Sequence, residues 1–186
     1  MHRRTLLAAP LAAAPACATA QPRPTPSNVP LRERLAGLRL GANLERWFTV
    51  ASNNQPRRLG SAWWRGFKSA GFDHVRIFIP DVSQTGDGGD GNSVIGMYRQ
   101  AVADAVDAGL PVLLGLSDFY GYDNAWGRRE WVAFEARAAL FARTDPSQVV
   151  LAPLNEPAFP DTATWLPVRE RLLSTLRRAA PRHLLM

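Results

Sequence analysis

Two kinds of hydrophobic pattern alternate along this chain from residue 31 onward. Short apolar runs predict buried strands at residues 38–43, 73–79, 111–116, from 149, and at 182–186. Apolar residues at helical spacing predict a short helix at 31–36 and longer helices at 61–70, 93–108, 129–143 and 161–179. The strand starts are separated by roughly 34 to 39 residues, the length of a strand, a loop and a returning helix. The chain is therefore predicted to belong to the α/β class.

Two architectures share this alternation, an open doubly wound sheet and a closed (β/α)8 barrel. No G-x-G-x-x-G sequence follows the first predicted strand, where Gly41-Ala42-Asn43 stands instead, which disfavours a dinucleotide-binding sheet. The predicted strands end in polar or aromatic residues, as barrel strands do at the rim that carries the active site. We therefore expect a (β/α)8 TIM barrel represented by roughly its first four to five β/α units, in a chain truncated before the barrel closes.

Side-chain patterns within these elements predict which faces are buried. The second strand alternates between two sets of residues, Val75, Ile77 and Ile79 on one face and His74, Arg76 and Phe78 on the other. Ser61 is the predicted N-cap of the helix that follows the first strand, and Gly71 is its predicted stop. The tryptophans that fall in helices are predicted to be core residues: Trp63, Trp64, Trp131 and Trp165.

The N-terminal region is typical of an exported protein. In residues 1–20, Arg3-Arg4 precedes an apolar segment, and Ala18-Thr19-Ala20 fits a signal-peptide cleavage site. The paired arginines also resemble a twin-arginine signal, and lipid attachment at Cys17 is a less favoured alternative. Residues 21–37 are expected to form a proline-rich linker and lead-in. We expect a periplasmic or extracellular protein that lacks cysteine after cleavage.

The formal charge of +6 does not by itself indicate a nucleic-acid partner. The basic residues are almost all arginines, scattered among acidic and apolar positions without the basic stripe of a nucleic-acid-binding surface. The apolar segment of the leader is too short to span a bilayer. The histidines form no metal-ligand cluster, and the aspartate-rich stretch 81–90 is not followed by the glutamate of an EF-hand. We expect no cofactor, no nucleic acid and no membrane span, and the oligomeric state stays open.

Glu156 follows a strongly apolar predicted strand. The stretch from Val149 begins as a strand buried on both faces and ends in Asn155-Glu156-Pro157. Proline cannot continue a central strand, so the strand must end there. A carboxylate at the C-terminal mouth of a buried parallel strand occupies the position where barrel enzymes carry catalytic groups. The alternative is that Glu156 caps the helix predicted at 161–179.

Arg76 lies in the middle of a strand that is expected to be covered on both faces. A buried guanidinium is costly unless a carboxylate or several acceptors pair with it. Arg76 therefore predicts an anion inside the barrel mouth. The alternative is a structural ion pair with an acid such as Asp73 or Asp118.

Four segments together carry a family resemblance: Leu40–Leu44, Gly71–Ile77, Ala108–Leu114 and Leu154–Pro157. Their order and spacing resemble those of glycoside hydrolase family 5, the cellulase-like family of retaining (β/α)8 barrels. The resemblance implies an enzyme that hydrolyses a β-linked polysaccharide, a glucan or a mannan, without a cofactor. It matches Glu156 to the general acid/base, Asn155 to the residue that binds the sugar 2-hydroxyl, and Arg76 to the arginine that supports the nucleophile. Residues 38–186 would then be the N-terminal half of the catalytic domain.

The same resemblance implies a second carboxylate that this chain does not supply. A retaining glycosidase holds its acid and its nucleophile about 5–5.5 Å apart. The family nucleophile is a glutamate after the seventh strand, so this fragment alone is expected to be inactive. The acid must be kept partly protonated by desolvation, and Glu156 beside Pro157 is expected to lie in such surroundings. The alternative function is a catalytically inactive carbohydrate-binding or self-associating half-barrel module, because a half-barrel exposes sheet edges.

Further residues near the rim are expected to contact the sugar: Asn43, Trp47, Asp118, Tyr122 and Trp126. Aromatic planes stack on the apolar C–H faces of sugar rings, while sugar hydroxyls bond to neighbouring polar groups. Ser117-Asp118 stands where members of the family often carry histidines. The alternative for each aromatic residue is ordinary anchoring of a loop.

Overall fold

The computed structural model of the chain describes residues 31–44, 58–79, 94–117 and 127–186. Within these ranges strands and helices alternate, and the strands form one parallel sheet of five. Its order is β1-β2-β3-β4-β5, so each strand is paired with its neighbour in the sequence. A doubly wound sheet reverses its strand order at a switch point, whereas consecutive strands of a barrel lie side by side. The α/β class is confirmed, and the sheet has the order of consecutive barrel strands.

The strands are short and fall within the predicted apolar runs or overlap them: β1 Gly41–Leu44, β2 His74–Phe78, β3 Val112–Gly115, β4 Val149–Ala152 and β5 Leu184–Leu185. One row of residues in direct register crosses all of them: Asn43, Arg76, Leu113, Val150 and Leu184. We call the sheet face that carries this row the inner face. The predicted first strand began too early, because the amides of Arg39 and Leu40 donate to the Asp73 carboxylate instead of to a neighbouring strand.

The helices agree with the predicted ones to within a few residues: α1 Leu31–Ala36, α2 Ser61–Ser69, α3 Val94–Asp107, α4 Arg128–Phe141 and α5 Thr162–Ala179. Gly71 and Gly109 follow α2 and α3 with φ angles of 99° and 75°, which glycine adopts without steric cost. Ser61 is not the N-cap. Gly60 holds that position, and no side chain caps the first turn of α2.

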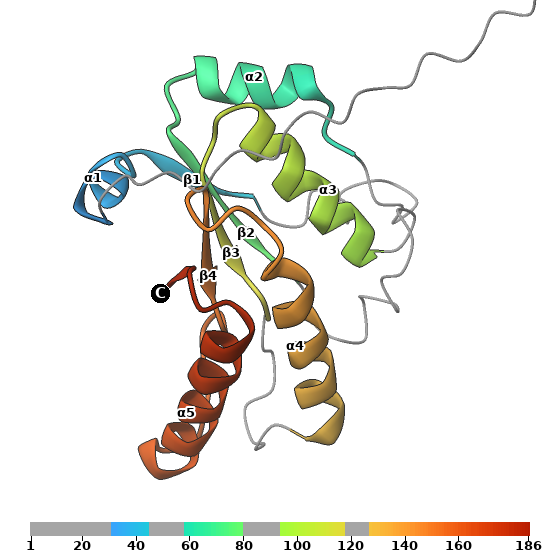
Figure 1. Cartoon of the computed structure of the whole chain (residues 1–186), viewed down its shortest axis with the longest axis vertical. Coiled ribbons are helices and arrows are strands. Elements are labelled where there is room, and N and C mark those ends of the chain that lie inside the picture. The colour runs from blue at the N-terminus through green and yellow to red at the C-terminus, as the bar shows by residue number, and fades with distance from the viewer. Residues whose placement is uncertain (1–30, 45–57, 80–93, 118–126) are drawn as a thin grey trace, which may run out of the picture.

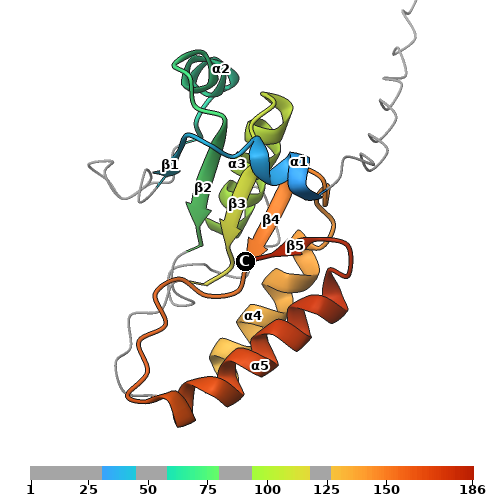
Figure 2. The same ribbon diagram turned by 90° about the vertical axis from the view of Figure 1, so that its left-hand side faces the viewer.

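The hydrophobic core lies between the sheet and the helices α2 to α5. In β2, Val75 and Ile77 are fully buried in one cluster with Trp64 of α2 and Phe134 of α4. Residues His74 and Arg76, one position away, are half-buried on the inner face, as the alternation predicted. Figure 2 looks onto the inner face, with α3 behind the sheet and α1 in front of it. Figure 1 shows the same arrangement from the side.

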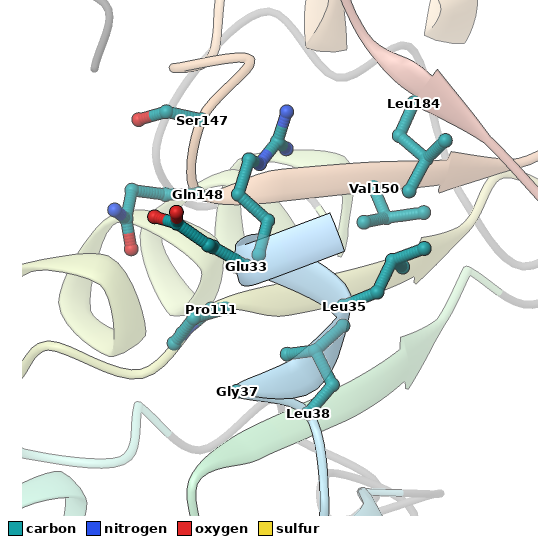
Figure 3. Close-up of a pocket in the computed structure, with 10 residues that line it drawn as sticks. Glu33, Leu35, Gly37, Leu38, Pro111, Ser147, Gln148, Val150 and Leu184 are labelled. Atoms are coloured by element: carbon teal, nitrogen blue, oxygen red, sulfur yellow. The ribbon is translucent and has the colours of Figure 1, made fainter. Parts of the chain in front are cut away.

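Helix α1 lies against the N-terminal end of the inner face, and the two border a half-open pocket of about 210 Å³. Leu35 and Leu38 point across this pocket toward Val150 and Leu184 of the sheet (Figure 3). The lining is completed near the start of β3 and β4 by Pro111, Ser147 and Gln148. Arg34 donates from Nη2 to the Pro146 carbonyl at 2.5 Å, whereas its buried Nε has no partner among the described residues. The pocket therefore lies at the opposite end of the strands from the rim where a catalytic site was expected.

Trp63 corrects one core prediction. Trp64 and Trp131 are buried and Trp165 packs against the core, but Trp63 is 39% exposed and stacks on the ring of Phe67. Adjacent helical residues point about 100° apart, so residues 63 and 64 cannot both face the sheet. None of the helices in the described ranges is long and apolar enough to cross a membrane.

Candidate functional site

The carboxyl ends of β2, β3 and β4 bring together residues that are far apart in the sequence. Arg76 of β2 donates from Nη2 to Oδ1 of Asn155, which follows β4, over 3.2 Å. The backbone amide of Asn155 donates to the backbone carbonyl of Ser117, which follows β3, over 2.9 Å. Asn43 of β1 lies beside Arg76 in the sheet register. We call these residues, with Glu156, the candidate site; parallel strands place them at one edge of the sheet, toward the lower end in Figure 2.

Arg76 has neutral partners within the described residues. Its guanidinium carbon lies 4.1 Å from the centre of the Phe78 ring, and its hydrogen-bond acceptor is the amide oxygen of Asn155. The predicted anion is absent from this part of the chain, where no ion pair involves Arg76. Arg76 is only half-buried, so solvent, an aromatic face and one amide acceptor lower the cost of its charge. Asp118, one proposed alternative partner, lies outside the described residues.

Asp73, the other proposed partner of Arg76, forms its hydrogen bonds at the opposite end of the strands. Its carboxylate lies 2.6 Å from Nδ1 of His74 and accepts hydrogen bonds from the amides of Arg39 and Leu40. Burial acts to raise the pKa of the Asp73 carboxyl, but the hydrogen bonds from His74 and the two amides together hold that pKa below its usual range. Asp73 therefore joins the entry of β1 to the start of β2 and is excluded as the partner of Arg76.

Glu156 does not cap the next helix. The N-cap of α5 is Asp161, whose carboxylate accepts from the Thr164 amide at 2.7 Å. Glu156 itself has a φ angle of 45°, a region that side-chain-bearing residues rarely occupy. It is exposed, so the desolvated surroundings that the sequence predicted for it are not found among the described residues. Asn155, one residue earlier, is half-buried.

Arg137 is a residue that the sequence analysis missed. It lies on α4, is only 4% exposed, and donates from Nη1 to the carbonyl of Leu116 at 2.9 Å and to Oγ of Ser117 at 3.2 Å. A signal for it was present, because position 137 lies three residues after the buried Phe134 and four before the buried Phe141. An arginine on the buried face of a helix has to reach acceptors, and these acceptors are at the end of β3.

Several predicted substrate contacts lie outside the described residues: Trp47, Asp118, Tyr122 and Trp126. Asn43 is described and lies in the candidate site beside Arg76. In the described residues no group of three or more histidine, cysteine, aspartate or glutamate side chains could hold a metal ion. The candidate site thus offers an amide, a guanidinium and a carboxylate, which suit hydrogen bonding and proton transfer.

The fold of this chain is similar to those of several solved proteins, among them endoglucanases. A trimodular endoglucanase of the GH5_4 subfamily superposes with a TM-score of 0.65 at 16% identity, covering 83% of this chain and 34% of that one. A mutant of Cel5A from Thermotoga maritima in complex with cellobiose gives a TM-score of 0.64 at 19% identity, covering 82% of this chain and 55% of that one. The cellulose synthase subunit Z of Clostridioides difficile gives a TM-score of 0.62 at 19% identity, covering 80% of this chain and 51% of that one.

These similarities describe the fold, because all three identities are below 20%. No protein-family model matches the chain, and no curated protein matches its sequence. The chain spans about half the length of Cel5A and of the clostridial subunit, and about a third of the trimodular enzyme. The described part of the chain therefore has a fold similar to part of these solved structures.

Proposed function

We propose that this chain carries the acid/base half of a retaining glycoside hydrolase that acts on a β-linked glucan or mannan. The observation that carries the proposal is the hydrogen bond of 3.2 Å from Arg76, in the middle of β2, to Asn155, which follows β4 and directly precedes Glu156. The likeness to endoglucanase folds, one of them solved with cellobiose, supports a polysaccharide or oligosaccharide as the substrate. Arg76 and the consecutive residues Asn155 and Glu156 come from two segments far apart in the sequence, and the sheet brings these segments together.

Each residue has a distinct role in the proposed reaction. Glu156, as the acid, would donate a proton to the glycosidic oxygen as the bond to the leaving sugar breaks, and would later take a proton from the attacking water. Asn155 would bind the 2-hydroxyl through its side-chain amide group while its Oδ1 accepts from Arg76. Arg76 would then fix the orientation of that amide and support the nearby nucleophile. Glu156 is exposed in the described part of the chain, so the substrate, or the further segment of the barrel that carries the nucleophile, would have to bury it.

The nucleophile is not among the residues of the candidate site. Glu156 is the only carboxylate in that site as the structure describes it. The retaining mechanism needs a second carboxylate about 5–5.5 Å away. We propose that a glutamate from a further segment of the barrel provides it, facing the inner side of the sheet across from Arg76.

The test is the release of reducing sugar from β-glucans and β-mannans by the complete gene product and its variants. Glu156→Gln, which keeps the shape but cannot donate a proton as the acid does, is expected to reduce hydrolysis by about 10²- to 10⁴-fold. Glu170→Gln is the matched control, because Glu170 is an exposed glutamate on α5 that pairs with Arg169. Equal activity of Glu156→Gln and the parent protein would reject Glu156 as the acid/base.

A catalytically inactive carbohydrate-binding or self-associating module is the second candidate. It is favoured by the two outer strands, since in the described sheet β1 pairs only with β2 and β5 only with β4. Unpaired strand edges readily accept another strand. Saturable binding of cellohexaose without hydrolysis, together with a concentration-dependent dimer in sedimentation, would favour this module over the enzyme.

We also propose that the protein is exported, with cleavage after Ala20. The proposal rests on the arginine pair, the apolar segment and the small residues before Gln21. The N-terminal sequence of protein recovered outside the cytoplasm should begin at Gln21. Recovery of a chain that still begins at Met1 would contradict it.

A further inference from the structure

Arg137 connects helix α4 to the candidate site from the far side of the sheet. Its guanidinium is buried in the helix layer, and its Nη1 donates both to the Leu116 carbonyl at 2.9 Å and to the Ser117 hydroxyl oxygen at 3.2 Å. Ser117 is itself buried, and its carbonyl accepts the amide of Asn155 at 2.9 Å. The next contact is the hydrogen bond from Arg76 to Asn155. One continuous set of hydrogen bonds therefore joins α4, the end of β3, the end of β4 and the middle of β2.

We propose that Arg137 is a positioning residue that fixes Asn155 by holding the Leu116–Ser117 segment in place. An effect of Arg137 on catalysis rests on the proposed function, in which Asn155 binds the substrate. The physical reason is that Asn155 lies beyond the last residue of β4, Ala152, so the regular ladder of the sheet does not hold it. Its backbone is tied instead to Ser117, which likewise lies beyond β3. Arg137 anchors that second segment to a helix.

An arginine suits this role because of its geometry. The guanidinium is planar, and the two N–H bonds of its Nη1, which donates to both acceptors, have fixed directions within that plane. The two acceptors here are on successive residues, so the contact restrains the direction of the backbone as well as its distance. A lysine ammonium would keep the charge, but its N–H donors rotate on a flexible side chain and would not fix these directions. Small displacements matter at such a site, because a misplacement of about 1 Å can reduce a reaction rate by about 10²-fold.

The first experiment uses NMR to measure hydrogen exchange at the backbone amide of Asn155 in the variants Arg137→Met and Arg137→Lys. Loss of the anchor is expected to speed exchange at this amide by about tenfold in the methionine variant and by less in the lysine variant. The amide of Ile79 serves as the internal reference, since it donates to the Gly115 carbonyl at the same end of the sheet. Ser117→Ala removes only the contact to the hydroxyl and gives a milder variant if Arg137→Met fails to fold.

Arg177→Met is the matched control for general loss of stability. Arg177 on α5 also donates from one Nη1 to two backbone carbonyls, those of Pro181 and His183, both at 3.0 Å. These carbonyls precede β5, at the opposite end of the strands from Asn155. Faster exchange at Asn155 in the Arg137 variants but not in Arg177→Met supports the proposal. Unchanged exchange at Asn155, or an equal increase in Arg177→Met, overturns it.

The second experiment separates this inference from the proposed function. In the complete gene product, Arg137→Met is expected to lower kcat for cello-oligosaccharide hydrolysis by about tenfold or more with little change in KM, and Arg137→Lys to restore part of it. If Glu156→Gln leaves hydrolysis intact, the proposed function fails, yet the exchange experiment still decides whether Arg137 positions Asn155. If Glu156→Gln abolishes hydrolysis and Arg137→Met leaves kcat unchanged, the positioning role in catalysis is wrong.

Discussion

Arg76 and Asn155 are separated by 79 positions in the sequence, and the guanidinium of the first donates a hydrogen bond of 3.2 Å to the side-chain oxygen of the second. The contact joins the middle of β2 to the segment after β4 across the end of β3. It fixes the orientation of the side-chain amide of Asn155. The side-chain oxygen accepts from Arg76, so the side-chain NH2 group points in another direction. In the proposed enzyme, that NH2 group is what meets the sugar hydroxyl.

The contact should be measurable as a coupling energy. Arg76→Met, Asn155→Ala and the double variant form a double-mutant cycle in urea denaturation, and we expect a coupling of about 0.5–3 kcal/mol. The ion pair of Arg58 and Asp104, at 3.1 Å, is the control and should show a smaller coupling, because the Arg58 side chain is exposed and water screens its charge. Additive effects of Arg76→Met and Asn155→Ala would show that the hydrogen bond does not contribute to stability.

Gly41 should not tolerate a side chain. An added Cβ would come closer than van der Waals contact to the ring of His74, which lies beside it in the sheet register. We expect Gly41→Ala to reduce the free energy of unfolding by about 1–3 kcal/mol, and the added change His74→Ala to recover part of the loss. Gly66→Ala is the control, because a Cβ there meets nothing within 4 Å and alanine favours the helix by about 0.5–1 kcal/mol. Gly41→Ala at parental stability would mean that the ring moves freely aside.

The backbone at Glu156 should favour glycine over alanine. With a φ angle of 45°, any residue with a Cβ is disfavoured there, whereas glycine is not. We expect Glu156→Gly to be more stable than Glu156→Ala by about 1 kcal/mol in chemical denaturation, although both lose the proposed acid. Keeping a glutamate at this position would then cost stability for the sake of the site. Equal stabilities of the two variants would indicate that the segment relaxes to another conformation.

The stability of the fold should fall in mildly acidic solution because of His183. Burial, reinforced by the nearby charge of Arg182, lowers the pKa of His183, and its Nε2 lies 3.0 Å from the Thr144 hydroxyl oxygen. The unfolded chain therefore binds a proton more readily, so stability is lost as the pH falls below about 6.5, the ordinary pKa of histidine. We expect Tm to drop by a few degrees between about pH 7 and 5.5, and to drop less in His183→Gln. The same pH dependence in both proteins would assign the effect to other groups.

Much of the fold could be predicted from local pattern. The alternation in β2 separated Val75 and Ile77 from His74 and Arg76, and glycines 71 and 109 marked where helices stop. These features depend on a few neighbouring residues, so the sequence carries them directly. The N-cap at Gly60 and the exposure of Trp63 were missed, because the sheet decides where a short helix begins and which side of it is covered.

The identities of the candidate residues were also visible in the sequence, since Asn155-Glu156-Pro157 ends an apolar run and Arg76 interrupts one. The contacts of these residues could not be predicted from the sequence. A buried-looking arginine was expected to meet an anion, whereas among the described residues it contacts an amide oxygen and an aromatic ring. The exposure of Glu156 and the contacts of Arg137 likewise depend on how the chain turns at the rim and on which helix lies behind β3.

The sequence by itself therefore determined the alternation of strands and helices, the two faces of the strands and the residue types at their carboxyl ends. The tertiary structure alone decided the exposure of Glu156, the pairing of Arg76 with Asn155 and the anchoring of Ser117 by Arg137. The physical reason is the difference in the sequence distance over which these interactions act. Periodicity and turn preference act over a few residues, whereas hydrogen bonds between the ends of different strands depend on register and packing across the whole sheet.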